Sequence, residues 1–453
     1  MTTTTLAFSE PLRAELQSWL DDPNEVAGVL IARLVDDDRG VTLLARRLDR
    51  APADTYLDRR PDRLSLRSTG WVPSVRAAAD DGSVALFVHT HPGGPRAFSI
   101  HDDTVDDELH QAFMDLTGLP LYGALVLSGG HDRGLAGRLR RRTGPPLPID
   151  TFRTVGDRLT IQIAHDDLGS NEIHDRQIRA LGTAGQNILN SLRAGVVGAG
   201  GTGSPVLEQL TRLGLGHLVI IDDDTVTPST VARGYGTTTA DIGRPKVDVA
   251  ADHIHRIGLG TTVKPVNGNL RERNVIATLD HCDIVFCCVD GHAPRILLNR
   301  WAYWQLAPVI DLAVLASSSH GTIDSIDARV TWLSPGAACL LCRGRIDPRL
   351  AHVEQLDPEE RRRLAQQGYA PGLDEPEPSI VTYTSLVAAH ATTELLNRLF
   401  GFATPEPTET LLQLHERAIR HNRRPARPGC FCADPTRWGQ GTRDPYLDLT
   451  WTA

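Results

Sequence analysis

Three residues with metal-ligating side chains lie close together in the sequence: His89, His91 and Asp102. The histidines are two residues apart, so on a strand both imidazoles point to one face and can reach one metal ion. A carboxylate at the start of the next helix, Asp102, would complete three ligands and leave a fourth position open for water, as in catalytic zinc sites. The neighbouring Asp103 is the alternative acidic ligand. The sequence therefore predicts a catalytic zinc centre.

The spacing His-x-His, seven residues, Ser, two residues, Asp closely resembles that of JAMM (MPN-plus) metallopeptidases. The remaining member of the family's set is a Glu on an upstream strand, where this sequence has Glu25. The resemblance implies that His89, His91 and Asp102 bind zinc. It also implies that Glu25 acts as general base and acid and that Ser99 stabilises the tetrahedral oxyanion. Such enzymes hydrolyse isopeptide or peptide bonds after the C-terminal glycine of ubiquitin-like proteins; the alternative is a catalytically inactive domain of the same fold.

A second set of residues has the pattern of a nucleotide-binding loop. Residues 198–204 read Gly-Ala-Gly-Gly-Thr-Gly-Ser, after an expected strand and at the start of an expected helix. The glycines let the backbone approach a nucleotide closely, and the helix N-terminus favours its phosphates. They are Gly198, Gly200, Gly201 and Gly203. Asp222 ends the next expected strand, where a carboxylate can bind ribose hydroxyls, so the pattern fits NAD and ATP equally.

Charged residues after this loop separate ATP from NAD: Asp224, Arg233, Lys246 and Asp290. An NAD-dependent enzyme that transfers hydride does not need an Arg and a Lys directed at a triphosphate. An adenylating enzyme needs both to neutralise charge on the α-phosphate and the departing pyrophosphate, and an acid to hold Mg²⁺. The sequence therefore predicts an ATP-dependent adenylating enzyme.

Residues 170–432 resemble the superfamily of ThiF, MoeB and the ubiquitin-activating enzymes. The resemblance implies that Asp222 binds ribose and that Asp290 holds Mg²⁺. It implies that Arg233 and Lys246 bind phosphates and that Arg176 reaches ATP in the partner subunit of a homodimer. A carrier protein's C-terminal carboxylate would attack the α-phosphate to give an acyl adenylate. The family usually has Asn at position 230, where this chain has Thr230, and an inactive scaffold of the fold is the alternative.

Four of the seven cysteines form two close pairs, as Cys339-Leu-Leu-Cys342 and Cys430-Phe-Cys432. Two thiolate pairs far apart in sequence can close a tetrahedral structural zinc site, and unliganded thiols are the alternative. The other three cysteines lie in or beside an expected strand, where they are expected as small buried apolar residues. They are Cys282, Cys287 and Cys288.

The segment before the expected helix that contains Glu394 has no cysteine, although thioester-forming activating enzymes carry one there. Either the enzyme stops at the adenylate and a partner takes the acyl group, or a hydroxyl forms an oxyester. The candidate hydroxyls belong to Ser379, Thr382 and Thr384, with His390 as a possible base. The first route is favoured because an unactivated hydroxyl is a poorer nucleophile than a thiolate.

Alternating strands and helices must position these residues, which predicts an α/β protein. Strands are expected at 26–34, 84–89, 121–127, 194–198, 217–222 and 284–289, and helices at 101–116, 204–213 and 379–399. A proline-rich stretch at 143–148 marks the first boundary. The expected organisation is a JAMM-type α/β metallopeptidase domain at 1–150, a linker at 151–170, a Rossmann-like adenylation domain with a structural zinc site at 171–435, and a tail at 436–453.

The composition excludes several other classes of protein. With 41% hydrophobic and 23% charged residues the 453-residue chain is globular, and a net charge of −9 without a basic face argues against nucleic-acid or membrane binding. The chain is expected to be cytoplasmic. We predict a bifunctional enzyme that cleaves and activates a ubiquitin-like protein, with a separate conjugating enzyme. Alternatives are sulfur-carrier activation, with a peptidase that releases product from the carrier, and a non-catalytic assembly module that binds the ubiquitin-like fold.

Overall fold

The computed structural model describes residues 3–164, 172–319, 321–366, 378–403 and 407–442. The chain divides into two units, which are described separately. The first unit comprises Met1–Asp166, Trp304–Leu306 and Pro435–Arg443, and the second comprises the remainder. No helix in the described ranges is long and apolar enough to cross a membrane.

The first unit is built on a mixed sheet with the strand order β11-β10-β1-β3-β2-β6-β7-β8-β9. Its strands are β1 (Thr3–Ser9), β2 (Ala27–Asp37), β3 (Gly40–Arg50), β6 (Val84–His91), β7 (Leu121–Ser128), β8 (Gly134–Arg141), β9 (Leu147–Pro148), β10 (Thr151–Val155) and β11 (Leu159–Ile163). A separate hairpin consists of β4 (Tyr56–Arg60) and β5 (Arg63–Leu66). The helices are α1 (Glu10–Ser18), α2 (Val72–Asp81) and α3 (Ile100–Thr117).

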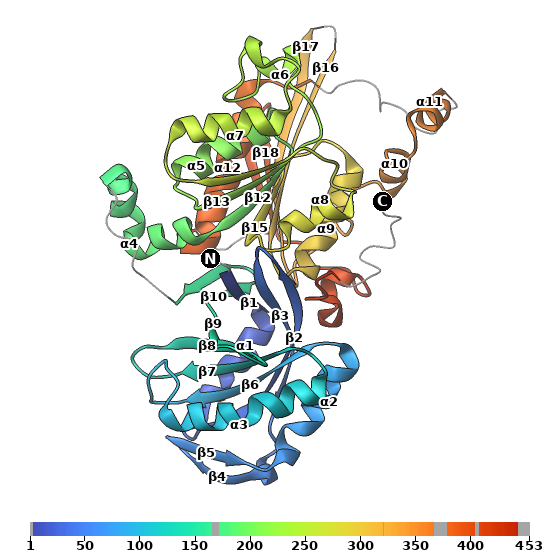
Figure 1. The fold of residues 1–453 in the computed structure, drawn as a ribbon. Coiled ribbons are helices and arrows are strands. Elements are labelled where there is room, and N and C mark those ends of the chain that lie inside the picture. The colour runs from blue at the N-terminus through green and yellow to red at the C-terminus, as the bar shows by residue number, and fades with distance from the viewer. Residues whose placement is uncertain (1–2, 165–171, 320, 367–377, 404–406, 443–453) are drawn as a thin grey trace. The chain divides into compact units, whose positions relative to one another are not determined.

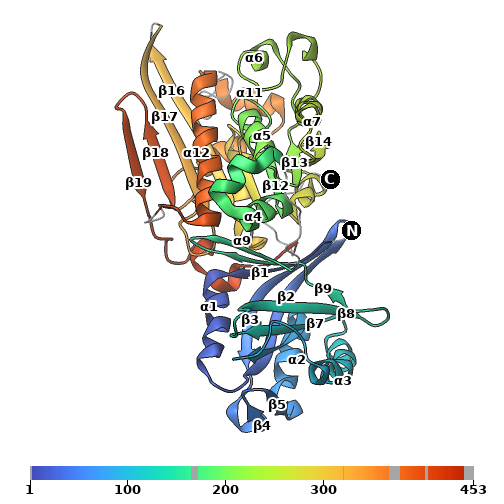
Figure 2. The same ribbon diagram turned by 90° about the vertical axis from the view of Figure 1, so that its left-hand side faces the viewer.

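Helices cover both faces of this sheet, with α1 on one face and α2 and α3 on the other (Figures 1 and 2). Successive side chains of a strand point to opposite faces, so β6 divides its residues between the two cores. Leu86 packs in the core on the α1 side, and Phe87 packs in the core on the α2 and α3 side. By the same alternation His89 and His91 face α3. The alternation of β6 thus decides on which side of the sheet the candidate zinc centre lies.

The end of the first unit differs from the expected boundary. The proline-rich stretch contains β9, whose Pro148 pairs with Arg138. A proline is tolerated there because β9 is the last strand of the sheet. Half of the expected linker also belongs to the sheet, because β10 pairs in parallel with β1 and β11 pairs with β10. Residues 165–170 of that linker lie outside the described residues.

The second unit contains a sheet with the order β14-β13-β12-β15-β16-β17-β18-β19. Its strands are β12 (Arg193–Val197), β13 (His217–Ile221), β14 (Thr262–Val266), β15 (Ile284–Cys287), β16 (Val309–Ser319), β17 (Thr322–Leu333), β18 (Glu409–Gln413) and β19 (Ala418–Asn422). Its helices are α4 (Asp175–Ser191), α5 (Gly203–Arg212), α6 (Pro228–Val231), α7 (Lys246–Ile257), α8 (Arg273–Ile276), α9 (His292–Trp304), α10 (Pro348–Val353), α11 (Pro358–Gln366) and α12 (Val381–Phe400).

Strands β12 to β16 run parallel, and β12 lies between β13 and β15. The chain therefore leaves β12 in one direction along the sheet and later returns to its other side. In open parallel sheets ligands bind beyond the carboxyl end of a strand at such a reversal. Figure 1 shows α5, α7 and α12 on one side of these strands and α8 and α9 on the other. The predicted α/β class with a Rossmann-like second unit is confirmed.

Candidate zinc centre and nucleotide site

Strand pairing brings Glu25 to the two histidines. β2 and β6 are antiparallel with Ala27 opposite His89, so two residues further along Glu25 comes beside His91. The hydroxyl of Thr90, between the histidines, accepts a 2.8 Å hydrogen bond from the backbone amide that follows Glu25. Oε1 of Glu25 lies 3.9 Å from Nε2 of His91. The pairing of two strands thus places an acid beside the predicted metal ligands.

The predicted ligand atoms converge on one point. Nε2 of His89 and Nε2 of His91 are 3.1 Å apart, and they lie 3.1 and 3.4 Å from the carboxylate oxygens of Asp102. The other ring nitrogen of His91 lies 3.1 Å from the carbonyl oxygen of Pro95, which orients the ring. Two imidazole nitrogens and a carboxylate oxygen are the donors that zinc takes in open catalytic sites. The donor set therefore fits zinc.

Ser99 and Asp102 are joined by a capping box at the start of α3. Oγ of Ser99 accepts a 3.1 Å hydrogen bond from the amide of Asp102, and Oδ2 of Asp102 accepts one from the amide of Ser99 at 2.6 Å. This reciprocal cap holds both side chains at the helix N-terminus beside the histidines. Asp103 instead pairs with Arg138 at 2.6 Å, so the acid that faces the histidines is Asp102.

The surroundings of these groups shift their protonation. Burial, as the largest cause, raises the pKa of Glu25 to about 7, against the opposing charge of His91. Burial also lowers the pKa of His89, which favours the neutral imidazole that binds metal. For Asp102 burial acts to raise the pKa, but hydrogen bonds with His89 and His91 outweigh it and hold the pKa far below its usual range. Asp102 is therefore a carboxylate.

The four paired cysteines come together in the second unit. The sulfurs of Cys339 and Cys430 are 3.7 Å apart, as are those of Cys342 and Cys432. All four sulfurs lie within 4.8 Å of one another, and the cysteines are free thiols. A tetrahedron with metal–sulfur bonds of about 2.3 Å has sulfur–sulfur edges of about 3.8 Å, so the geometry fits structural zinc.

The glycine loop follows β12 at the point where the strand order reverses. Gly198 has φ +92°, which glycine adopts without strain, and a Cβ on Gly203 would lie 1.7 Å from the carbonyl oxygen of Gly198. Oδ2 of Asp222 accepts a 2.6 Å hydrogen bond from the amide of Ala199. Burial, as the largest cause, raises the pKa of Asp222. The loop is thus folded against the carboxylate predicted to bind ribose.

Two cations face this loop. The side chain of Arg233 lies against Gly201, where an added Cβ would be 3.1 Å from its Cδ, and its buried Nε has no hydrogen-bond partner among the described residues. Nζ of Lys246 lies 2.7 Å from Asp224 and 3.6 Å from Asp222. An unpaired guanidinium nitrogen and an ammonium beside a glycine loop fit the phosphates of ATP.

Thr230 has a local structural role in this neighbourhood. Its hydroxyl lies 2.9 Å from that of Thr227, and its amide and hydroxyl complete a capping box with the same residue at the start of α6. Only 3% of the Thr230 surface is exposed. The substitution for the family's asparagine therefore serves the turn that precedes Arg233.

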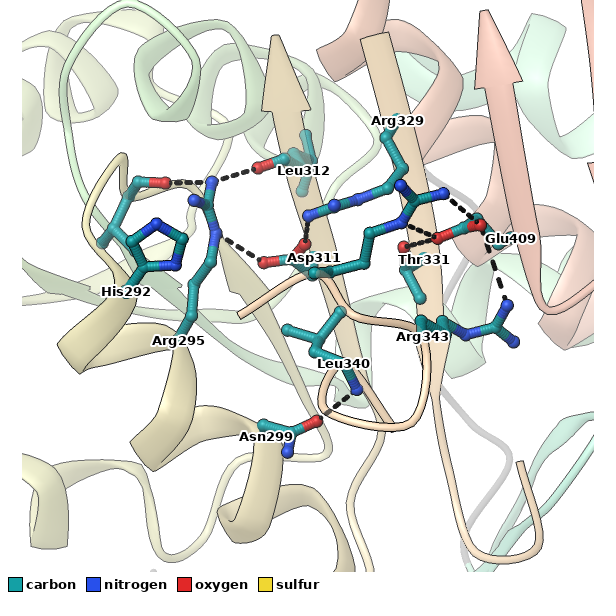
Figure 3. Close-up of polar contacts among 12 residues, drawn as sticks. His292, Arg295, Asn299, Asp311, Leu312, Arg329, Thr331, Leu340, Arg343 and Glu409 are labelled. Carbon is teal, nitrogen blue, oxygen red and sulfur yellow. Dashed lines mark hydrogen bonds and ion pairs between the residues drawn. The ribbon is translucent and has the colours of Figure 1, made fainter. Parts of the chain in front are cut away.

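A buried network of charges lies beside the loop of Asp290, and Figure 3 shows its members Arg295, Asp311 and Arg329. Asp290 is exposed, but its carbonyl oxygen accepts a 3.0 Å hydrogen bond from Arg295 of α9. Nε of Arg295 donates to Asp311 of β16 at 3.1 Å, and Arg329 also pairs with Asp311. Sequence reasoning missed Arg295 and Asp311. The signal for Arg295 was a charged residue five residues after Asp290, near the start of a helix rich in apolar residues.

The remaining predicted residues lie outside these contacts. Arg176 is exposed in the first turn of α4, before a break in the helix at Gly182. Thr384 is buried within α12 and donates a 3.1 Å hydrogen bond to the carbonyl of Val381. Thr382 is exposed, Ser379 is half-buried, and burial lowers the pKa of His390. Most of the segment before Ser379, residues 367–377, lies outside the described residues.

The two units correspond to two known families. The ThiF family model matches residues 174–432, more than half of the chain, and the chain belongs to the ThiF family. A model of prokaryotic homologues of the JAB domain matches residues 12–130. The predicted fusion of a JAB domain with a ThiF domain is therefore confirmed.

The chain is similar to several activating enzymes. It is 32% identical over 162 residues to the SAMP-activating enzyme E1 of Haloferax volcanii. This match covers 36% of this chain and 57% of that protein. It is 33% identical over 167 residues to the adenylyltransferase and sulfurtransferase UBA4 of Yarrowia lipolytica. This match covers 37% of this chain and 40% of UBA4. It is 30% identical over 175 residues to the molybdopterin-synthase adenylyltransferase of Escherichia coli. This match covers 38% of this chain and 68% of that protein.

The solved structures that match include Escherichia coli MccB with ATP. That match has a TM-score of 0.46 and 16% identity and covers 60% of this chain and 77% of MccB. The chain spans about half the length of the first two curated relatives.

Proposed function

We propose that this chain is a bifunctional enzyme that hydrolyses a peptide or isopeptide bond after the C-terminal glycine of a ubiquitin-like protein and adenylates the glycine carboxylate. The observation that carries the proposal is that each unit holds a nearly complete residue set for one of these reactions. The first unit gathers Glu25, His89, His91 and Asp102, with Ser99. The second gathers a glycine loop with Asp222, Arg233 and Lys246.

In the peptidase unit His89, His91 and Asp102 would hold zinc, which polarises the scissile carbonyl and makes water a stronger nucleophile near neutral pH. Glu25 would take the proton of the attacking water and give it to the leaving amine. Oγ of Ser99 accepts a hydrogen bond from the backbone amide of Asp102. Its own hydroxyl proton can therefore be donated to the oxyanion.

In the adenylation unit the carrier's terminal carboxylate would attack the α-phosphorus of ATP, and pyrophosphate would leave. Arg233 and Lys246 would neutralise the phosphate oxygens, Asp222 would bind ribose, and Asp290 would hold Mg²⁺. Lys246 would first exchange its contact with Asp224 for phosphate. Exposed Arg176 would complete the site of the partner subunit in a homodimer.

The acyl adenylate would pass directly to a partner. Among the hydroxyls considered for an oxyester, that of Thr384 is buried and bonded within α12, which supports this route. A separate conjugating enzyme would receive the acyl group in a cytoplasmic pathway of protein modification. Activation of a sulfur carrier is the second candidate, favoured by the molybdopterin-synthase adenylyltransferase among the relatives.

Two assays on the full chain test the two reactions separately. Exchange of pyrophosphate into ATP should require a carrier protein ending in glycine and should vanish in Lys246→Ala and Asp290→Ala. Cleavage of a carrier fusion should vanish in Glu25→Gln while exchange remains. Exchange that persists in both adenylation variants would refute the nucleotide assignment, and cleavage that survives Glu25→Gln would refute the peptidase assignment.

A further inference from the structure

A cavity of about 430 Å³ adjoins the candidate zinc centre in the first unit. It includes the ligands His89, His91 and Asp102, and it continues between α3, strands β6 and β7, and the β4–β5 hairpin. A peptide that ends in glycine has no side chain to fill such a space. The cavity beyond the ligands therefore has room for another part of the substrate.

Apolar side chains form most of the wall beyond the ligands. Phe87 and Ala124 rise from the sheet, Phe98 and Val105 come from the start of α3 and the loop before it, and Leu64 comes from the hairpin. The guanidinium of Arg138 stacks on the Phe98 ring, 4.0 Å from its centroid. Such a wall favours an apolar or aromatic group, because contact with it removes apolar surface from water.

Two buried polar side chains also line the cavity. Asp106 is 3% exposed and Tyr122 is 1% exposed. One carboxylate oxygen of Asp106 is paired with Arg138 and Arg140, at 2.9 and 2.5 Å. The Tyr122 hydroxyl interacts with the Asp106 carboxylate through a side-chain hydrogen bond, but among the described residues neither this hydroxyl nor the other oxygen of Asp106 has a partner of regular geometry. A poorly aligned hydrogen bond between buried groups leaves part of their hydrogen-bonding capacity unused, so a ligand donor that gives either atom a well-aligned bond gains affinity.

We propose that this cavity binds the side chain of the residue on the amine side of the scissile bond, and that this side chain is large and apolar with a hydrogen-bond donor at its tip, as in Tyr or Trp. The inference rests on the proposed peptidase, in which the residue on the acyl side is glycine. Asp106 is already neutralised by two arginines, so a neutral donor suits it better than a cation.

The inner end of the cavity argues against a lysine isopeptide as the preferred substrate. A target lysine continues into a protein backbone, which needs an exit from the site. Asp106 and Tyr122 line the cavity and are almost fully buried, so a side chain that ends beside them fits the cavity better than one that continues into a protein backbone. The substrate class is therefore a precursor in which a bulky residue directly follows the terminal glycine.

Binding tests the subsite independently of catalysis. Isothermal titration of the zinc-loaded full chain with glycinamide, phenylalaninamide and tyrosinamide should give at least tenfold tighter binding of the two aromatic amides, with tyrosinamide tightest. Equal affinities for glycinamide and tyrosinamide would overturn the proposal. The same chain should cleave acetyl-Gly-Gly-Tyr-amide faster than acetyl-Gly-Gly-Gly-amide, by a factor of about 10–200. If the aromatic amides bind but neither peptide nor a carrier fusion is cleaved, the proposed peptidase activity is refuted while the proposed binding subsite is supported.

Substitutions locate the subsite. Val105→Phe narrows the cavity and should reduce the preference for tyrosinamide over glycinamide at least fivefold. Thr104→Phe is the matched control, because Thr104 is the preceding residue of α3, is exposed and does not line the cavity; its preference should equal that of the wild type. Tyr122→Phe removes one of the two polar partners and should reduce the preference for tyrosinamide over phenylalaninamide. An unchanged preference in Val105→Phe would place the aromatic group elsewhere.

Discussion

Nε of Arg295 donates a hydrogen bond to Oδ1 of the fully buried Asp311 at 3.1 Å, and a second nitrogen of Arg295 donates to the carbonyl oxygen of Asp290 at 3.0 Å. One guanidinium therefore connects the core of the second sheet to the loop proposed to hold Mg²⁺. A buried ion pair adds little net stability compared with an apolar pair, but loss of one partner leaves an uncompensated charge. The network should therefore be sensitive to single substitutions.

We predict that Asp311→Asn lowers the free energy of unfolding by about 3–5 kcal/mol, because Arg295 and Arg329 lose their buried counter-charge. Pyrophosphate exchange should also fall, since the Asp290 loop loses its anchor. Urea unfolding followed by fluorescence measures the first effect. Asp252→Asn is the control: its ion pair with Arg244 lies at the surface, so its loss should be much smaller. Equal losses in both variants would contradict the role of the network.

The same carboxylate should contribute to stability in a pH-dependent way. Burial acts to raise the pKa of Asp311, but the charges of Arg295 and Arg329 and their hydrogen bonds outweigh it and lower the pKa below its usual value. Its stabilisation is therefore fully present above the pKa of an unfolded aspartate, about 4, and is lost as the pH falls further.

The difference in stability between the wild type and Asp311→Asn should consequently be constant from pH 7 to about pH 5 and shrink below about pH 4. Thermal unfolding of both proteins across this range measures it. A difference that grows on acidification would show that Asp311 is protonated in the folded protein at neutral pH.

The residues that carry chemistry were predictable where one segment of sequence contains the pattern. The His-x-His pair, Ser99 and Asp102 lie within 14 residues, and the structure brings their side chains together. The glycine loop after β12 and the α/β class were predictable for the same reason. The alternation of a strand and the capping of a helix are local rules, and both hold here.

The parts that could not be predicted depend on contacts between distant segments. β10 joins the first sheet by pairing with β1, about 145 residues earlier, so its segment reads as a linker. Asp106 and Tyr122 come together in the wall of a cavity that is formed by two strands, a helix and a hairpin. In the sequence Asp311 cannot be distinguished from other polar residues near the end of a strand. Its role follows only from the structure, in which Arg295 and Arg329 both pair with it.

The four-cysteine site should hold one zinc ion per chain. Cys432→Ser should remove that ion and lower the thermal stability strongly, because the ion would link residues 339–342 to residues 430–432. Metal analysis of the purified chain and thermal unfolding with and without a chelator measure both effects. Cys288→Ser is the control, since Cys288 is not part of the cluster and should retain the full zinc content. Full zinc content in Cys432→Ser would exclude the site.

Ser99 should have two separable roles, as a helix cap and as a hydrogen-bond donor in catalysis. Loss of its hydroxyl in Ser99→Ala should reduce kcat for carrier cleavage by about 10²–10³, the usual cost of one oxyanion donor. The same change should lower the free energy of unfolding by about 1 kcal/mol, because the backbone amide of Asp102 loses the hydrogen bond that it donates to Oγ of Ser99.

Ser99→Gly separates the two roles. Glycine is tolerated at a helix N-cap at a cost of only a few tenths of a kcal/mol, yet it lacks the hydroxyl. We therefore expect Ser99→Gly to lose as much kcat as Ser99→Ala while retaining nearly wild-type stability and zinc content. Steady-state kinetics, urea unfolding and metal analysis of the two variants make this comparison. If kcat instead followed stability, so that Ser99→Gly stayed nearly as active as the wild type, the hydroxyl would serve α3 alone and oxyanion stabilisation would have to come from another donor.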